Sequence, residues 1–252
     1  METQFEVEIC VDSLESAINA KKGGATRIEL CSSLLDGGIT PSLGMFKVMR
    51  KKIDIPIFVL IRPRGGDFYY AESEIEIMEE DISILKAHGA HGIVLGALTS
   101  DGAVDREACQ RLIEVANPLP VTFHRAFDMT KDAFRALEDV IALGCKRLLT
   151  SGQSKTVADG LELLGKLSKM AQGKIIIMPG GGINEDNLEA VLRITGTKAF
   201  HSSASISAKS QMTFINEKVS MGSGSSEYAS KVCSARKVEN LVQIAKGYFH
   251  SG

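Results

Sequence analysis

Three apolar segments of this chain end abruptly in polar or glycine-rich residues. Segment 57–61 (IFVLI) runs into RPRGGD at 62–67, segment 121–123 (VTF) into HRAFD at 124–128, and segment 175–178 (IIIM) into PGGG at 179–182. In parallel α/β proteins, ligands bind where the carboxyl ends of buried strands meet. This feature therefore predicts a parallel α/β fold with its chemically competent side chains gathered at one edge of the sheet.

Short apolar segments alternate with longer amphipathic ones along the chain. The expected strands are short and apolar, as buried parallel strands are, and they cover 5–10, 26–31, 57–61, 92–95, 120–124, 146–150, 174–178 and 198–202. The expected helices lie near 12–22, 42–52, 73–88, 105–115, 131–143, 155–171, 185–193 and 236–247. This alternation predicts an α/β fold of the (β/α)₈ TIM-barrel type, with a doubly wound open sheet as the alternative.

We expect a single barrel domain over residues 1–252, because the length is typical of one barrel and no linker interrupts the pattern. The exception is 203–234, which is rich in Ser, Gly and Lys and weakly periodic. It predicts a long irregular segment, either a loop or added strands, before the last helix. At 73–88, Ser73 and Glu76 have the spacing of a capping box, which places the helix start at Ser73.

Composition excludes several classes of partner. The formal net charge is −2 and no basic run dominates, which argues against nucleic acid. No apolar stretch approaches the ~20 residues of a membrane helix, and the first residues (METQF) lack the pattern of a signal peptide. Five cysteines without a CxxC pair suit reduced thiols in the cytoplasm.

The loops after the last two expected strands favour an anion. Gly180, Gly181 and Gly182 let backbone N–H groups approach a ligand, and Ser202 and Ser203 end the next strand. In many barrels the loops after the seventh and eighth strands bind phosphate. These residues therefore predict a phosphate or carboxylate site; the alternative is that the glycines only form a tight turn.

A second group of polar residues follows the third and fifth strands. Arg62, Arg64, His124 and Asp128 would lie at the mouth of the barrel if the strands alternate regularly. Arginine suits planar oxyanions, and histidine can exchange protons near neutral pH. These residues are candidates for catalysis; the alternative is a structural ion-pair network.

The first two expected strands each carry a carboxylate and a thiol two residues apart, and therefore on the same face of the strand. Glu8 and Cys10 share one face of strand 5–10, and Glu29 and Cys31 share one face of strand 26–31. Adjacent strands would then place two glutamates inside the barrel with two thiols above them. Two thiolates suit the soft ion Cu(I), although buried cysteines are usually inert.

Seven motifs of this chain resemble those of the CutC family, which is named for copper homeostasis. They are EICVDS (8–13), RIELCS (27–32), GGITPS (37–42), IRPRGGDF (61–68), TFHRAFD (122–128), LTSG (149–152) and MPGGGI (178–183). The resemblance extends over about residues 5–247. It implies a TIM barrel, a cytoplasmic and sometimes nuclear location, and a homodimer or homotetramer. It also implies Cu(I) binding through Cys10 and Cys31.

Three functions are left open. The first is a copper homeostasis protein that binds Cu(I) through Cys10 and Cys31. The second is an enzyme acting on a small anionic or phosphorylated metabolite, with Glu8, Glu29, His124 and Asp128 as proton-transfer groups. The third is a scaffold without chemistry, which the polar residues at every strand end make least attractive.

Overall fold

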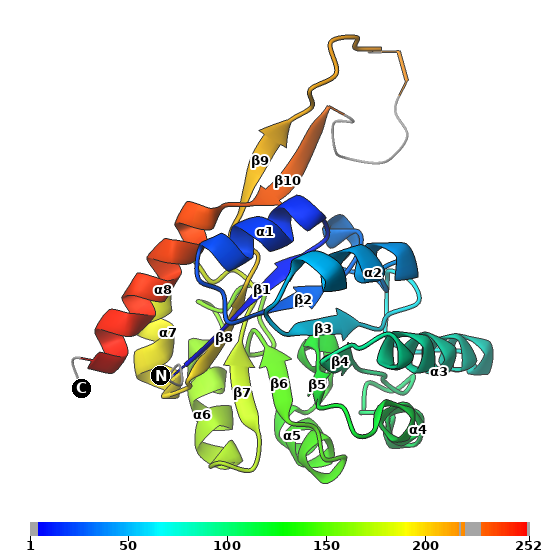
Figure 1. Ribbon diagram of the computed structural model, residues 1–252. Coiled ribbons are helices and arrows are strands. Elements are labelled where there is room, and N and C mark those ends of the chain that lie inside the picture. The colour runs from blue at the N-terminus through cyan, green and yellow to red at the C-terminus, as the bar shows by residue number, and fades with distance from the viewer. Residues whose placement is uncertain (1–4, 217, 220–227, 251–252) are drawn as a thin grey trace.

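Eight parallel strands form one sheet that curls into a nearly closed barrel (Figure 1). The computed structural model describes residues 5–216, 218–219 and 228–250. The strands are β1 Glu6–Val11, β2 Arg27–Leu30, β3 Ile57–Leu60, β4 Gly92–Leu95, β5 Val121–Phe123, β6 Arg147–Thr150, β7 Ile176–Pro179 and β8 Ala199–Ser202. Their order is β7-β6-β5-β4-β3-β2-β1-β8. The end strands β7 and β8 lie in contact, and Thr197 Oγ1 donates to the Ile177 carbonyl at 2.5 Å across this seam. The predicted (β/α)₈ barrel is confirmed, and the open sheet is not formed.

Eight helices surround the barrel within the described part of the chain. They are α1 Leu14–Lys22, α2 Leu43–Lys52, α3 Glu72–Ala87, α4 Arg106–Ala116, α5 Ala133–Ala142, α6 Leu161–Ala171, α7 Leu188–Thr195 and α8 Ala235–His250. The main core lies between these helices and the outward faces of the strands, where Ile9, Ile28 and Val59 are fully buried. None of the helices among the described residues has the length and apolar character needed to cross a membrane.

The starts of helices α3 and α6 differ from the sequence patterns for identifiable reasons. Helix α3 starts at Glu72, because Glu74 accepts a hydrogen bond from the Ala71 N–H at 2.8 Å. The Ser73–Glu76 capping box is therefore wrong. Helix α6 starts at Leu161 instead of near 155. Its delay has a packing cause, since a Cβ on Gly160 would lie 1.9 Å from the Ser151 carbonyl oxygen. The chain at 152–160 is thus folded tightly against the end of β6.

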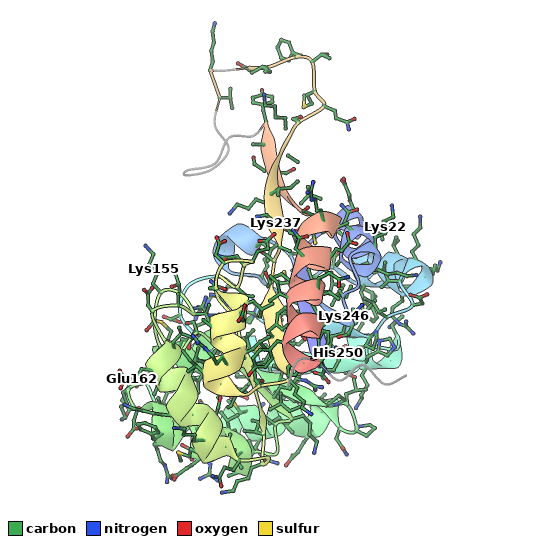
Figure 2. All side chains as sticks on the ribbon, turned by 90° about the vertical axis from the view of Figure 1, so that its left-hand side faces the viewer. Lys22, Lys155, Glu162, Lys237, Lys246 and His250 are labelled. Atoms are coloured by element: carbon green, nitrogen blue, oxygen red, sulfur yellow. The ribbon has the colours of Figure 1, made fainter. Side chains whose placement is uncertain are left out.

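Residues 203–234 add two strands outside the barrel. Strands β9 (Ser205–Lys209) and β10 (Ala229–Cys233) pair antiparallel and project beyond the barrel in both views (Figures 1 and 2). The base of this hairpin is fixed to α1, because the Cys233 N–H donates to Ser16 Oγ at 3.1 Å. Of the two readings of 203–234, added strands are correct; 217 and 220–227 lie outside the described residues.

Candidate functional site

Ion pairs fill the lower part of the barrel interior. Arg27 Nη2 lies 2.6 Å from Glu8, which is fully buried. Arg147 pairs with Glu6 at 2.6 Å. Both guanidinium groups lie over the Phe58 ring, at 4.1 and 5.6 Å from its centroid. The parity of β1 and β2 thus directs Glu8 inward as predicted, and Arg27 supplies its counter-charge.

Glu29 and His201 form the next contact toward the mouth. Their Oε2 and Nε2 atoms are 2.8 Å apart, and Glu8 Oε1 lies 3.8 Å from the same nitrogen. Burial alone would lower the pKa of His201, but the charge and hydrogen bond of Glu29 together with the charge of Glu8 raise it. Burial would likewise raise the pKa of Glu29, but His201 lowers it. The two side chains therefore form a carboxylate–imidazolium pair.

Cys10 and Cys31 lie side by side above this pair, as the parity predicts. Their sulfurs are 3.6 Å apart. Cys31 is fully buried, and its Sγ donates to the Val11 carbonyl at 3.6 Å. The hydrogen bond with Cys31, together with burial, raises the pKa of Cys10 well above its usual value. Without a metal the Cys10 side chain is thus a neutral thiol.

A cavity of about 200 Å³ opens at the carboxyl ends of the strands. Its walls come from most of the barrel strands and the loops that follow them: Cys10, Glu29, Leu34, Gly37, Leu60, Arg62, Phe68, His124, Arg125, Leu149, Gly181, Gly182, His201, Ser202 and Ser203. The predicted gathering of chemically competent residues at one edge is therefore present. Glu8, Cys31, Arg64, Asp128 and Gly180 do not line it.

His124 lines the cavity as a neutral imidazole. Its Nδ1 accepts from the Ala126 N–H at 3.2 Å, so the proton of the neutral ring lies on Nε2. Gly96 permits this arrangement, because a Cβ there would lie 2.7 Å from Nδ1. Burial lowers the pKa of His124 to about 4. Nε2 is buried without a hydrogen-bond partner among the described residues.

The two arginines after β3 have different roles. Arg62 donates to the backbone carbonyls of Asp36 and Gly38 at 2.7 and 2.9 Å and lies over the Phe68 ring. Its Nε is buried without a partner among the described side chains and backbone. Arg64 instead pairs with Glu74 at 2.6 Å, outside the cavity. The structure thus brings Arg62 to the mouth and keeps Arg64 away from it.

Asp128 organises the loop after β6. Its carboxylate accepts from Arg125 Nε at 2.8 Å, from the Ser151 and Gln153 N–H groups at 3.0 and 3.1 Å, and from the Thr150 hydroxyl. These donors occupy both oxygens, so Asp128 positions Arg125 and the loop and does not face the cavity. Arg125 itself lines the cavity, as its place beside His124 after β5 suggests.

The glycine loop offers a smaller set of donors than the sequence suggests. The Gly180 N–H donates to the Thr150 carbonyl at 3.0 Å, and the Ser202 hydroxyl donates to the Ile183 carbonyl at 2.9 Å. The N–H groups of Gly181, Gly182 and Ser203 have no hydrogen-bond partner among the described residues. Gly181 has a φ of +92°, and a Cβ there would lie 3.2 Å from Cζ of Arg125. The donors left for an anion are therefore the backbone N–H groups of Gly181, Gly182 and Ser203, because the Gly180 N–H and the Ser202 hydroxyl are already used.

His201 is a cavity residue that the sequence patterns do not single out. It lies within the expected strand 198–202, next to Ser202. The register pairs Glu8 with His201 across β1 and β8, and this places His201 against Glu29 as well. Strand alternation could have indicated its inward direction. His201 and Ser202 point to opposite faces of their strand, just as Cys10 and Ile9 do.

Comparison with known proteins gives consistent matches. The model of the family described as "CutC family" matches residues 5–206. Two relatives, from Mus musculus and Homo sapiens, are called "Copper homeostasis protein cutC homolog". Each is 51% identical to this chain over 244 residues, which is 96% of this chain. The alignment covers 90% of the mouse protein and 89% of the human protein. The crystal structure of a CutC protein from Streptococcus agalactiae is 34% identical with a TM-score of 0.75, over 79% of this chain and 98% of that one.

Proposed function

The chain belongs to the CutC family, and from this premise we propose that it binds Cu(I) through the thiolates of Cys10 and Cys31. Its relatives named for copper homeostasis support a role in that process. The observation that carries the finer proposal is the 3.6 Å separation of the two sulfurs at the barrel mouth. Thiolates are the soft ligands that select Cu(I).

The two thiols fit the ion with a small adjustment. Metal–thiolate bonds are about 2.3 Å long, so a linear S–Cu–S unit needs sulfurs about 1 Å farther apart than the 3.6 Å seen here. Cys10 lines the cavity and gives the ion an entry path, whereas Cys31 lies behind it. Binding must also displace the thiol protons, so the affinity should fall as the pH is lowered.

We predict that the double variant Cys10→Ser, Cys31→Ser loses Cu(I) affinity by at least about 100-fold, since even changes to residues that only orient a metal ligand cost 10–100-fold. The measurement is an anaerobic titration against a competing Cu(I) chelator. The double variant Cys109→Ser, Cys145→Ser is the matched control, because these thiols are also buried but lie away from the cavity. Equal affinity in the parent and the Cys10/Cys31 variant would refute the ligand assignment.

We place this activity in the cytoplasm, with the nucleus as a second location, and in a homodimer or homotetramer. Five cysteines without a CxxC pair support a reducing compartment. The family resemblance supports the oligomer. Cell fractionation and light scattering of the purified protein test these two points.

A small anionic or phosphorylated metabolite is a second candidate ligand, because the cavity holds donors that two sulfurs do not need. His124 Nε2 and Arg62 Nε are buried and unpaired among the described residues. Leaving a buried donor unpaired costs about 1–3 kcal/mol. An oxyanion in the cavity would satisfy such donors, and Gly181, Gly182 and Ser203, whose N–H groups are free among the described residues, line the same cavity.

We expect millimolar phosphate to shift the amide resonances of Gly181, Gly182 and Ser203 in a ¹⁵N-labelled sample. Backbone N–H groups next to a phosphate change their hydrogen bonding, and the positive dipole of a loop of this kind favours the anion. Chloride at the same ionic strength is the control. Resonances that respond equally to chloride and phosphate, or to neither, would exclude this anion site.

A further inference from the structure

Three different metal-ligating groups converge on the floor of the cavity. The Cys10 sulfur, a Glu29 carboxylate oxygen and a His201 ring nitrogen all lie within 4.8 Å of one another. They come from β1, β2 and β8, which are neighbours in the sheet. All three residues line the cavity. An ion entering from the mouth would meet these atoms directly.

The chemistry of this set differs from that of the cysteine pair. One sulfur, one nitrogen and one oxygen suit a borderline divalent ion such as Zn²⁺ better than Cu(I), which prefers soft ligands alone. Catalytic zinc sites typically have three protein ligands and one open position. Here the open position would face the space bounded by His124 and Arg62.

Access also separates the two sets of ligands. Cys31 is fully buried and does not line the cavity. The chain at Gly38 covers it, because a Cβ on Gly38 would lie 3.5 Å from the Cys31 sulfur and 2.7 Å from Leu60. A cation at Cys10, Glu29 and His201 needs no movement of this cover. An ion thus reaches all three of these ligands from the cavity once the 2.8 Å contact between Glu29 and His201 opens, whereas it reaches only one sulfur of the cysteine pair.

The surrounding charges fit a divalent ion. The fully buried carboxylate of Glu8 lies 3.8 Å from His201 Nε2 and 2.6 Å from Arg27 Nη2. The ion would take the place of the proton of His201 and the thiol proton of Cys10, and both protons leave to solvent. The two positive charges of the ion then replace those of the two protons, so the net charge of the barrel interior is unchanged. This limits the cost of burying the ion.

We propose that Cys10, Glu29 and His201 form a site for a divalent, zinc-like cation with one coordination position open to the cavity. The site does not depend on the Cu(I) proposal. Both sites use Cys10, so the two metals would exclude each other. Cu(I) would thereby act as a competitor for the divalent site.

Zinc titration of the apoprotein tests the proposal, with the metal alone as the probe and a chromophoric chelator as competitor. We expect one equivalent of Zn²⁺ to bind, and His201→Gln to weaken it by at least about 100-fold. The same variant should keep its Cu(I) affinity, while Cys31→Ser should lose Cu(I) affinity but bind Zn²⁺ within about threefold of the parent. Cys145→Ser is the control for both metals, and melting curves verify that each variant folds.

X-ray absorption of the zinc-loaded parent gives a readout that needs no variant. We expect one sulfur at about 2.3 Å together with nitrogen and oxygen ligands at about 2.0–2.2 Å. Two sulfurs bound to the zinc ion, or Zn²⁺ affinity that survives His201→Gln, would overturn the proposal. Neither result would affect the Cu(I) assignment, which rests on the response to Cys31→Ser.

Discussion

Replacing Arg27 with methionine is expected to lower the free energy of unfolding by about 3–5 kcal/mol, the usual cost of breaking a buried ion pair. Arg27 is 4% exposed, and its partner Glu8, at 2.6 Å, is 0% exposed. The variant keeps an apolar stem of similar length but leaves the Glu8 carboxylate without its main counter-charge. A buried carboxylate without a partner is strongly unfavourable. Urea denaturation at pH 7 measures the loss.

Two comparisons isolate the charge effect from packing. The double variant Arg27→Met, Glu8→Gln should recover much of the stability, because the uncompensated charge is gone. Lys131→Met removes one partner of an exposed pair with Asp101, where both side chains are more than half exposed. Such surface pairs contribute about 0–1 kcal/mol. A loss as small for Arg27→Met as for Lys131→Met would mean that Glu8 is hydrated in the folded protein.

The barrel and the inward direction of the charged residues could be predicted because both follow from local periodicity. Eight apolar segments separated by amphipathic ones suffice for the (β/α)₈ fold. Within β1 and β2, strict alternation places Glu8, Cys10, Glu29 and Cys31 on the interior face, and the thiols do lie together. Parity applies only inside strands, where the backbone fixes the direction of each side chain.

Residues in the loops could not be placed in the same way. Arg64 and Asp128 follow strands, but their side chains turn to Glu74 and to the backbone of Ser151. These partners are set by how the loops pack on one another, which no local pattern encodes. The hairpin of 203–234 was ambiguous for a related reason. Its strands face solvent on both sides, so the alternation of buried and exposed residues that marks a strand is missing.

His201 shows a different limit. Its direction was readable from parity, but its importance depends on Glu29, which is 172 positions away in the chain. Only closure of the sheet through the β1–β8 ladder brings them together. Pairs of this kind form only when strands that are distant in the sequence become neighbours in the sheet. The pattern within one strand therefore predicts the direction of each side chain but not the contact between them.

Lowering the pH from 6.5 to 4 is expected to remove about 3 kcal/mol of stability through His124 alone. Burial lowers the pKa of His124 from 6.5 to about 4 in the folded protein, with a further lowering by Arg62 that Glu29 and Asp128 oppose. Between these two values the unfolded chain binds a proton that the folded protein does not, so stability falls as the pH falls. Each unit of pKa difference corresponds to about 1.4 kcal/mol.

His201 and Glu29 act mostly outside this window, whereas burial raises the pKa of Glu8 above 4.5, so Glu8 opposes the effect of His124 by adding stability as the pH falls. His201 has a raised pKa, so its stabilisation is fully present below 6.5 and is lost as the pH rises through its folded pKa. Glu29 has a lowered pKa, so its stabilisation is lost only as the pH falls below 4.5. His91 does contribute in the same direction as His124, because burial lowers its pKa too. It lies outside the cavity, where its Nδ1 accepts from the Ile57 N–H at 3.0 Å.

His124→Asn is the matched variant, because the asparagine oxygen can replace Nδ1 as the acceptor for the Ala126 N–H without titrating. Its free energy of unfolding, measured by urea denaturation at several pH values, should vary far less between pH 6.5 and 4 than that of the parent. His91→Asn keeps the corresponding acceptor for Ile57 and should retain most of the parent's slope. Identical slopes in the parent and His124→Asn would show that His124 is protonated as easily in the folded protein as in water. The ring would then be a cation at mildly acidic pH, and the assignment of a neutral Nε2–H donor would have to be abandoned.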